Sequence, residues 1–349
     1  MKAKSWRIAD PAGGLIVLFT LLLWSCGGKP AGDKTVSLTL GAYTVPKEAY
    51  EREIIPAFKT YWQEKTGETV TFNESYTASG AQSRAIASGF DADIAALSLE
   101  QDVQRLVEVG LVTHDWRATQ FSGMVTRSIV VMAYREGNPK RITGWEDLTR
   151  PDVNVIYPSP KTSGGAMWVV NAIYGAALKH SEILWGEPDP NFAYRRLREI
   201  QSRVQVMDKS GRASVTTFEN GIGDVLLTYE NEVLLRKSQG KAMPFLVPDA
   251  TILIENPIAV VDKNVEKHGN RAVAEAFVAF VKTASAQRAF AQYGFRPVDP
   301  DIAEEFLAKF PVPKHLFTIQ DLGGWPQVHQ QLYAQTGIWM QIVNELAHQ

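Results

Sequence analysis

The chain has 349 residues, of which 21% are charged and 45% hydrophobic, and its formal net charge at pH 7 is −2. This length suits two domains of ordinary size, and the composition is that of a globular protein. Because the chain has neither a basic excess nor an acidic block, no nucleic-acid partner is expected, whereas backbone dipoles can still hold a small anion.

The amino-terminal segment has the layout of a secretory signal. Basic residues precede an apolar stretch over residues 13–24, and a small-residue end follows from Ser25. The apolar stretch is about 12 residues long, which is short of the ~20 that span a bilayer as a stable helix. We therefore predict a signal peptide over residues 1–25, with an uncleaved membrane anchor as the alternative.

Cys26 follows this stretch directly and is the only cysteine of the chain, so it cannot form an internal disulfide. The run Leu23-Trp24-Ser25-Cys26 resembles the bacterial lipobox, which implies lipidation of Cys26. An incidental thiol is the alternative. Residues 26–35 are rich in glycine and polar residues and are predicted to form a flexible tether. The lipid is then the expected attachment to the membrane.

From residue 36 onward, predicted strands and helices alternate. The helix over 46–67, for example, is indicated by Tyr50, Ile54, Phe58 and Trp62, which are spaced four apart on one face. Such alternation is typical of an α/β fold with parallel strands. In chain order we expect strand 36–42, helix 46–67, strand 69–74, helix 81–88, strand 93–97, helix 99–109, strands 128–134 and 153–157, helices 166–179 and 191–202, strand 204–207, helix 214–220, strand 224–229, helix 230–237, extended chain 251–261, helices 270–283 and 284–293, and mostly helix over 326–347.

No linker rich in proline, glycine and serine divides this part of the chain. We therefore expect two lobes joined by crossing strands, with the best crossing points at 128–134 and 251–261. Residues 36–127 and 253–349 are assigned to lobe I, and residues 128–252 to lobe II.

Three segments share one design, in which a strand end leads through a turn of small residues into a helix. They are Ser79-Gly80, Ser163-Gly164-Gly165, and the turn at Gly211. A helix amino terminus exposes unpaired N–H groups and a partial positive charge, and glycine allows a ligand to approach the backbone closely. Each segment alone could be an ordinary helix cap. Three of them at the carboxyl ends of strands, where α/β proteins bind ligands, favour an anion site.

Signatures of catalysis and of metal or cofactor binding are not found in the sequence. It has no nucleotide-phosphate loop, no dinucleotide fingerprint, no serine-nucleophile elbow and no histidines at metal-ligand spacing. Asp91 and Asp93 are interpreted as strand-entry residues rather than an acid/base pair, and Asp208 as a loop carboxylate that faces solvent or caps its own turn. No enzyme activity, metal or cofactor is therefore expected.

Several motifs also make the chain similar to the sulfate-binding proteins of bacterial ABC importers, from about residue 36 to the final helices. The motifs are the runs 73–82, 137–140, 145–148, 158–168, 221–232 and 323–325. The resemblance implies a two-lobed type II periplasmic-binding fold with the ligand in a cleft between the lobes, and an ABC permease as partner.

The resemblance also implies a set of hydrogen-bond donors. Ser79 at the first helix start, the Ser163 hydroxyl, backbone N–H groups of Gly164 and Gly165, and a backbone N–H at Gly211 belong to it. A backbone N–H near Thr44 and the phenol of Tyr229, where several relatives carry tryptophan, complete the set.

The signal-like segment and Cys26, together with the resemblance, imply an exported, lipid-anchored monomer on the periplasmic or cell-surface side of a bacterial membrane, which captures sulfate. Sulfate is fully ionised at neutral pH and only accepts hydrogen bonds, so a site made only of donors satisfies it, while hydrogen phosphate also needs an acceptor. Thiosulfate, molybdate, tungstate and phosphate stay open as ligands. A phosphate- or sulfate-ester enzyme on a similar fold is the rival class.

Overall fold

The computed structural model describes residues 34–241 and 243–348. The predicted signal peptide, Cys26 and the tether up to residue 33 lie outside these residues, and their assignments stay predictions. Within the described ranges, no helix has both the length and the apolar character needed to cross a bilayer.

The elements alternate as the sequence predicts, although several bounds differ. The first part of the chain contains β1 (Thr35–Tyr43), α1 (Lys47–Ala49), a π-helical turn (Tyr50–Ile54), α2 (Ile55–Thr66), β2 (Thr69–Thr77), α3 (Ser79–Ala87), β3 (Ile94–Ala96), α4 (Glu100–Glu108) and β4 (Met124–Tyr134). The middle part contains β5 (Val155–Ile156), α5 (Gly164–Trp185), α6 (Pro190–Gln201), β6 (Val204–Val206), α7 (Gly211–Glu219), β7 (Val225–Tyr229), α8 (Glu230–Ser238), β8 (Phe245–Leu246) and β9 (Ala250–Val260). The last part contains α9 (Asp262–His268), α10 (Arg271–Phe280), α11 (Ala284–Gln292), α12 (Pro300–Glu305), β10 (His315–Phe317), α13 (Gly324–Val328), a π-helical turn (His329–Tyr333) and α14 (Ile338–Ala347).

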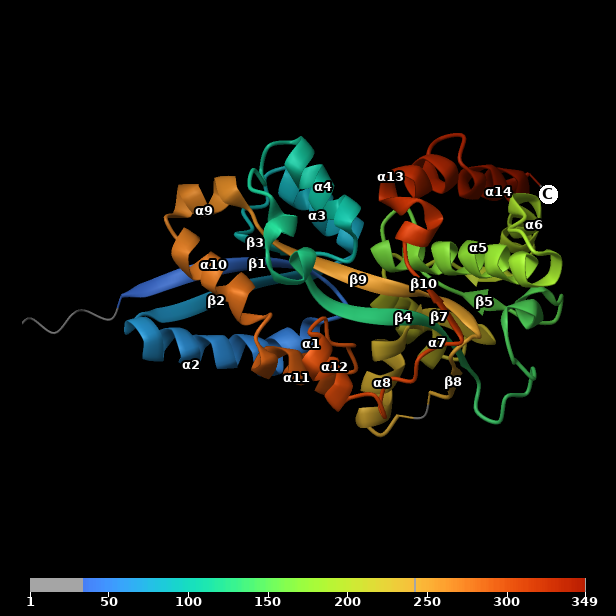
Figure 1. The fold of residues 1–349 in the computed structure, drawn as a ribbon, viewed down its shortest axis with the longest axis horizontal. Helices are drawn as coiled ribbons and strands as arrows, with labels where there is room; N and C mark the ends of the chain where they lie inside the picture. Colours follow the sequence, from blue (N-terminus) through green and yellow to red (C-terminus); the bar gives the residue numbers. More distant parts are fainter. Residues whose placement is uncertain (1–33, 242, 349) are drawn as a thin grey trace, which may run out of the picture.

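One mixed sheet runs through the molecule in the order β2-β1-β3-β9-β4-β7-β5-β6. β1 is parallel to β2 and β3, and β5 is parallel to β6 and β7, so each half has its own parallel core. The long antiparallel strands β4 and β9 connect the halves, and Figure 1 shows them crossing the middle of the molecule. This is the two-lobed α/β arrangement, with lobe I around β1–β3 and lobe II around β5–β7.

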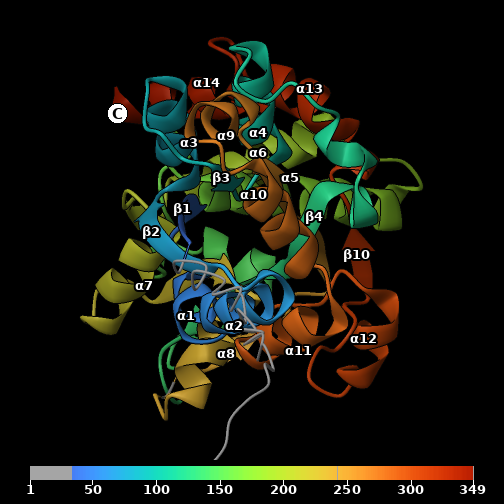
Figure 2. The same ribbon diagram turned by 90° about the vertical axis from the view of Figure 1, so that its left-hand side faces the viewer.

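In lobe I, side chains alternate between the faces of the sheet, as the period of a strand requires. Leu38 and Leu40 of β1 lie in the same core as Phe58 of α2 and Phe277 of α10, whose rings meet edge to face. On the other face, Ala95 of β3 packs in the core beneath α3 and α4. Figure 2 shows α3 and α4 on one side of these strands and α2 on the other.

Lobe II is built the same way. Val130 and Met132 of β4 belong to the core that contains much of α5, while Val131 faces the opposite core with Val215 of α7 and Val233 of α8. Helices therefore cover both faces of each half of the sheet, and the carboxyl ends of the parallel strands are left to form a site.

The carboxyl-terminal segment packs differently from the expected division. Residues 253–349 were assigned to lobe I, but β10 pairs with the start of β9, and the helices that follow lie on α5 and α6 of lobe II. Trp325 packs against Trp168, and the Tyr333 hydroxyl donates to the Met167 carbonyl. Aromatic side chains of the tail complete the surface of α5, so the chain returns to lobe II after α12.

Candidate functional site

The ends of six elements converge on one small cavity between the lobes. Lobe I contributes the turn after β1, the start of α3 and the end of β3, and lobe II contributes the starts of α5 and α7 and the end of β7. The lining residues are Tyr43, Thr44, Val45, Ala78, Ser79, Ser98, Ser163, Gly164, Gly165, Gly211 and Tyr229.

The size of this cavity limits what it can hold. Its volume is about 10 Å³. A cavity this small suits a ligand of a few atoms better than a nucleotide, a sugar or an amino acid.

The start of α5 presents its donors directly to this cavity. Ser163 is the residue before the helix, and its hydroxyl neither caps the helix nor bonds to another described residue. Gly164 and Gly165 follow, and both are glycine because of close packing. A Cβ on Gly164 would lie 2.7 Å from Ser98 Oγ, and one on Gly165 would lie 2.7 Å from Tyr229 Cε2. The unpaired N–H groups of the first turn are therefore accessible to a ligand.

At the start of α3, the serine hydroxyl is engaged in hydrogen bonds within the protein. The Ser79 hydroxyl donates to Asp102 Oδ2 (2.6 Å) and accepts from the Ser98 N–H (2.8 Å). The hydroxyl proton of Ser79 is therefore already used in the hydrogen bond to Asp102. The donor that Ser79 can still offer a ligand is its backbone N–H. Burial raises the pKa of the Asp102 carboxyl, while Ser79 and Arg105 act against that rise.

Gly211 lies at the start of α7. The Ser210 side chain caps this helix by accepting from the Ala213 N–H, which leaves the Gly211 N–H to the cavity. A Cβ on Gly211 would lie 3.7 Å from Val45 Cγ2, an ordinary contact. This position therefore has room for alanine, unlike Gly164 and Gly165.

Tyr229 and Ser98 form a hydroxyl pair in the cavity wall, with 2.7 Å between their oxygens. Sequence reasoning named Tyr229 and missed Ser98, although Ser98 follows a buried strand at its carboxyl end, the signal that identified the other positions. The Ser98 carbonyl also accepts from Trp168 Nε1 and from Asn256 Nδ2 of β9. Ser98 thus connects lobe I, lobe II and a crossing strand.

The structure brings Thr44 to the cavity but not Gly80. Thr44 lies in the turn after β1, opposite the start of α7. Gly80 is one residue too far along α3 to line the hole. A Cβ there would lie 3.1 Å from the Thr162 carbonyl oxygen, so Gly80 allows α3 to approach the turn before α5.

No ionised side chain lines the cavity among the described residues. Behind the lining, Asp102 contacts Ser79 and pairs with Arg105, and a second group of charges lies next to α7. Arg212 pairs with Glu48 of lobe I and with Glu232, which also pairs with Arg236. Burial acts to raise the pKa of Glu48, but pairing with Arg212 holds that pKa below its usual value. Burial raises the pKa of Glu232. The Arg212–Glu48 pair therefore links the lobes beside the cavity.

The carboxylates considered in the sequence are placed outside the cavity. Asp208 accepts from Ser214 and Thr217 of α7, so it supports its own helix. Asp93 accepts from the Thr39 N–H at the entry to β3, and Asp91 pairs with Lys267. These contacts are structural, and they leave the cavity lined by neutral groups.

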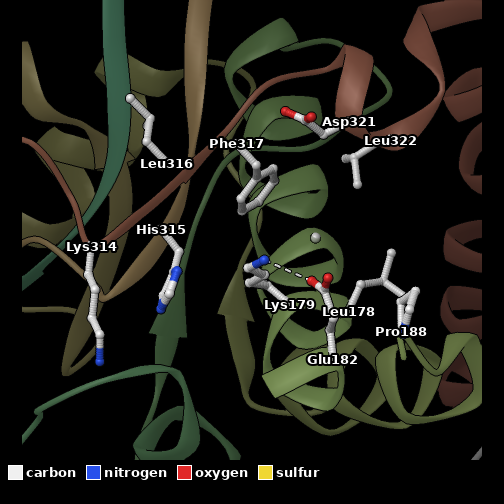
Figure 3. A pocket seen from close by; sticks show the side chains of 11 residues that line it. Leu178, Lys179, Glu182, Pro188, Lys314, His315, Leu316, Phe317, Asp321 and Leu322 are labelled. Carbon is white, nitrogen blue, oxygen red and sulfur yellow. Dashed lines mark hydrogen bonds and ion pairs between the residues drawn. The ribbon is translucent and has the colours of Figure 1, made fainter. Parts of the chain in front are cut away.

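A larger cavity, of about 570 Å³, lies between α5 and the segment that contains β10. Figure 3 shows its lining, where Lys179 and Glu182 pair with each other at 2.8 Å. Lys314, at its edge, lies 4.0 Å from Asp249. The lining carries side chains of both signs, including the carboxylates of Glu182 and Asp321, so this cavity lacks the convergent neutral donors of the smaller one.

Comparisons of this chain with known proteins all point to the same class of protein. Residues 38–296 match the family described as bacterial extracellular solute-binding protein. The chain is 38% identical to a sulfate-binding protein of Synechococcus elongatus over 341 residues, covering 96% of this chain and 95% of the relative. It is 34% identical to a thiosulfate-binding protein of Pseudomonas aeruginosa, covering 86% of this chain and 90% of the relative.

Solved structures agree. The sulfate-binding protein SubI of Mycobacterium tuberculosis has 40% identity and a TM-score of 0.78, with 85% of this chain and 99% of that chain covered. A periplasmic thiamin-binding protein shares the fold at 14% identity, with a TM-score of 0.62 and coverage of 89% of this chain and 96% of that chain. The fold is therefore the one found in bacterial solute-binding proteins. The chain belongs to the family of bacterial extracellular solute-binding proteins.

Proposed function

We propose that this protein captures sulfate between its lobes and delivers it to an ABC permease. The observation that carries the proposal is the small cavity lined by neutral donors and by no carboxylate among the described residues. A fully ionised dianion that only accepts hydrogen bonds suits such a lining, because each donor finds an acceptor and no carboxylate of the lining repels the anion. The names of several relatives support the same ligand.

In this proposal the ligand is held by the hydroxyls of Ser163 and Tyr229 and by backbone N–H groups at Thr44, Ser79, Gly164, Gly165 and Gly211. Both lobes contribute donors, so ligand binding favours the closed arrangement, and β4 and β9 act as the hinge. The Arg212–Glu48 pair strengthens closure from outside the cavity.

We further propose that the chain is exported, that Cys26 carries a lipid, and that the protein acts as a monomer. The lipobox-like sequence before Cys26 supports the anchor. Metabolic labelling with a radioactive fatty acid tests it, since Cys26→Ser should abolish incorporation.

A thermal-shift screen with sulfate, thiosulfate, molybdate, tungstate and phosphate tests the ligand. At a concentration of 100 times Kd, a ligand stabilises the folded state by about 2.7 kcal/mol, a rise of about 4 °C in Tm for a chain of this size. Sulfate should give such a rise and phosphate should not. Strong stabilisation by phosphate without a response to sulfate contradicts the proposal.

The rival class, an ester-cleaving enzyme, is tested separately. Among the residues that the structure describes, the cavity lining offers no ionised general base and no charged nucleophile. Turnover of aryl sulfate or aryl phosphate esters by the purified protein would replace the binding proposal with an enzymatic one.

A further inference from the structure

Lys282 is a buried cation away from the anion cavity. It follows α10 and is 3% exposed. Its ammonium donates to Thr119 Oγ1 at 2.6 Å, and among the described residues it has no other hydrogen bond and no ion pair. An ammonium has three N–H donors, and a buried charge without a counter-ion is costly. Burial lowers the pKa of Lys282 to about 8, so the group is still mostly protonated at neutral pH.

Lys282 and its partner Thr119 both line a cavity of about 260 Å³. Val260, Val278 and Ala279 contribute apolar surface, and Thr119 lies at the same wall. The other titratable side chains of the lining already have partners, because His114 contacts Asp262 at 2.7 Å and Glu275 contacts Arg271 at 3.2 Å. Among the described residues, Lys282 is therefore the side chain of this lining that has no oppositely charged partner.

We propose that this cavity is a second ligand site, which takes a small carboxylate with an apolar body. A carboxylate would supply the counter-charge and the acceptors that Lys282 lacks, and a short hydrocarbon chain would cover the apolar wall. A dianion such as sulfate fits poorly here, because one ammonium meets only half of its charge and the valine side chains offer no donor. The site is independent of the proposed sulfate function.

Titration calorimetry with hexanoate and hexanol, two probes of equal chain length, tests the site on the purified protein. Hexanoate should bind saturably and about tenfold or more tightly than hexanol, since only the acid pairs with the ammonium. Lys282→Met keeps the stem but removes the charge, and should abolish the preference for hexanoate. Lys263→Met, at an exposed lysine of α9, is the matched control and should bind hexanoate as the wild type does.

A second variant tests the site independently, in case Lys282→Met does not fold. Ala279 lies at the exposed side of α10, so Ala279→Leu should fill the cavity while leaving Lys282 in place. It should also abolish hexanoate binding, with an unfolding midpoint close to that of the wild type. The proposal is overturned by the absence of saturable hexanoate binding in the wild type, or by equal binding in wild type and Lys282→Met.

Discussion

Two glycines at helix starts should respond very differently to the same substitution. Gly165→Ala places a Cβ 2.7 Å from Tyr229 Cε2, closer than real Cβ atoms approach a neighbour, and Tyr229 is a buried ring at the end of a central strand. Gly211→Ala places its Cβ 3.7 Å from Val45 Cγ2, an ordinary contact. The first substitution must displace either α5 or Tyr229, whereas the second displaces neither.

The expected loss follows from the donors that move. A displaced first turn of α5 misaligns at least one hydrogen bond to an ionised ligand, and such bonds contribute about 1.5–3 kcal/mol each. Sulfate binding to Gly165→Ala should therefore be weaker by about 10- to 150-fold, and binding to Gly211→Ala should stay within about threefold of the wild type.

Isothermal titration with sulfate measures both variants, and unfolding midpoints without ligand check that each one folds. Alanine is the better helix former, so a loss of stability is not expected from helix propensity. Near-wild-type binding by Gly165→Ala, or an equal loss in Gly211→Ala, would refute the reasoning about close packing at the cavity.

Three further outcomes are expected. Glu48→Gln removes a charged partner of Arg212 across the lobes and should weaken sulfate binding by about 3- to 10-fold in calorimetry, with Glu51→Gln at an exposed pair as an unaffected control. Tyr229→Phe removes one donor and leaves Ser98 without its hydroxyl partner, so affinity should fall about tenfold or more. Because burial raises the pKa of Tyr229, its phenol stays neutral and sulfate affinity should be constant between about pH 6 and 9; a steady loss over that range would contradict a neutral donor.

The sequence located the three turns of small residues because they depend on local chemistry, although α3, α5 and α7 begin two or three residues earlier than the predicted helices. Small residues after a buried strand mark positions where the backbone approaches a ligand or a neighbouring element closely. Those that line the cavity include Ser163, Gly164, Gly165 and Gly211. Gly80 was also predicted to bind the ligand, but it does not line the cavity. Each successive residue of a helix is rotated by about 100° around the axis, so the residue after Ser79 faces a different direction.

What the sequence could not show is how groups far apart pair in space. The Ser79 hydroxyl is directed to Asp102, which lies 23 positions later, and no local pattern reveals that partner. Ser98 was overlooked for the same reason, since its role depends on Tyr229 and Asn256 of other elements. The helical character of the tail was visible, but its docking on lobe II rests on contacts such as Trp325 with Trp168.

The central claim is that a ring of neutral donors around Ser163 holds one sulfate ion. Calorimetry of sulfate with the wild type, Ser163→Ala and the exposed control Ser202→Ala tests it most directly. We expect one sulfate per chain, affinity about tenfold or more weaker in Ser163→Ala, and an unchanged value in Ser202→Ala. Absence of binding heat with sulfate, or wild-type affinity in Ser163→Ala, would contradict the claim.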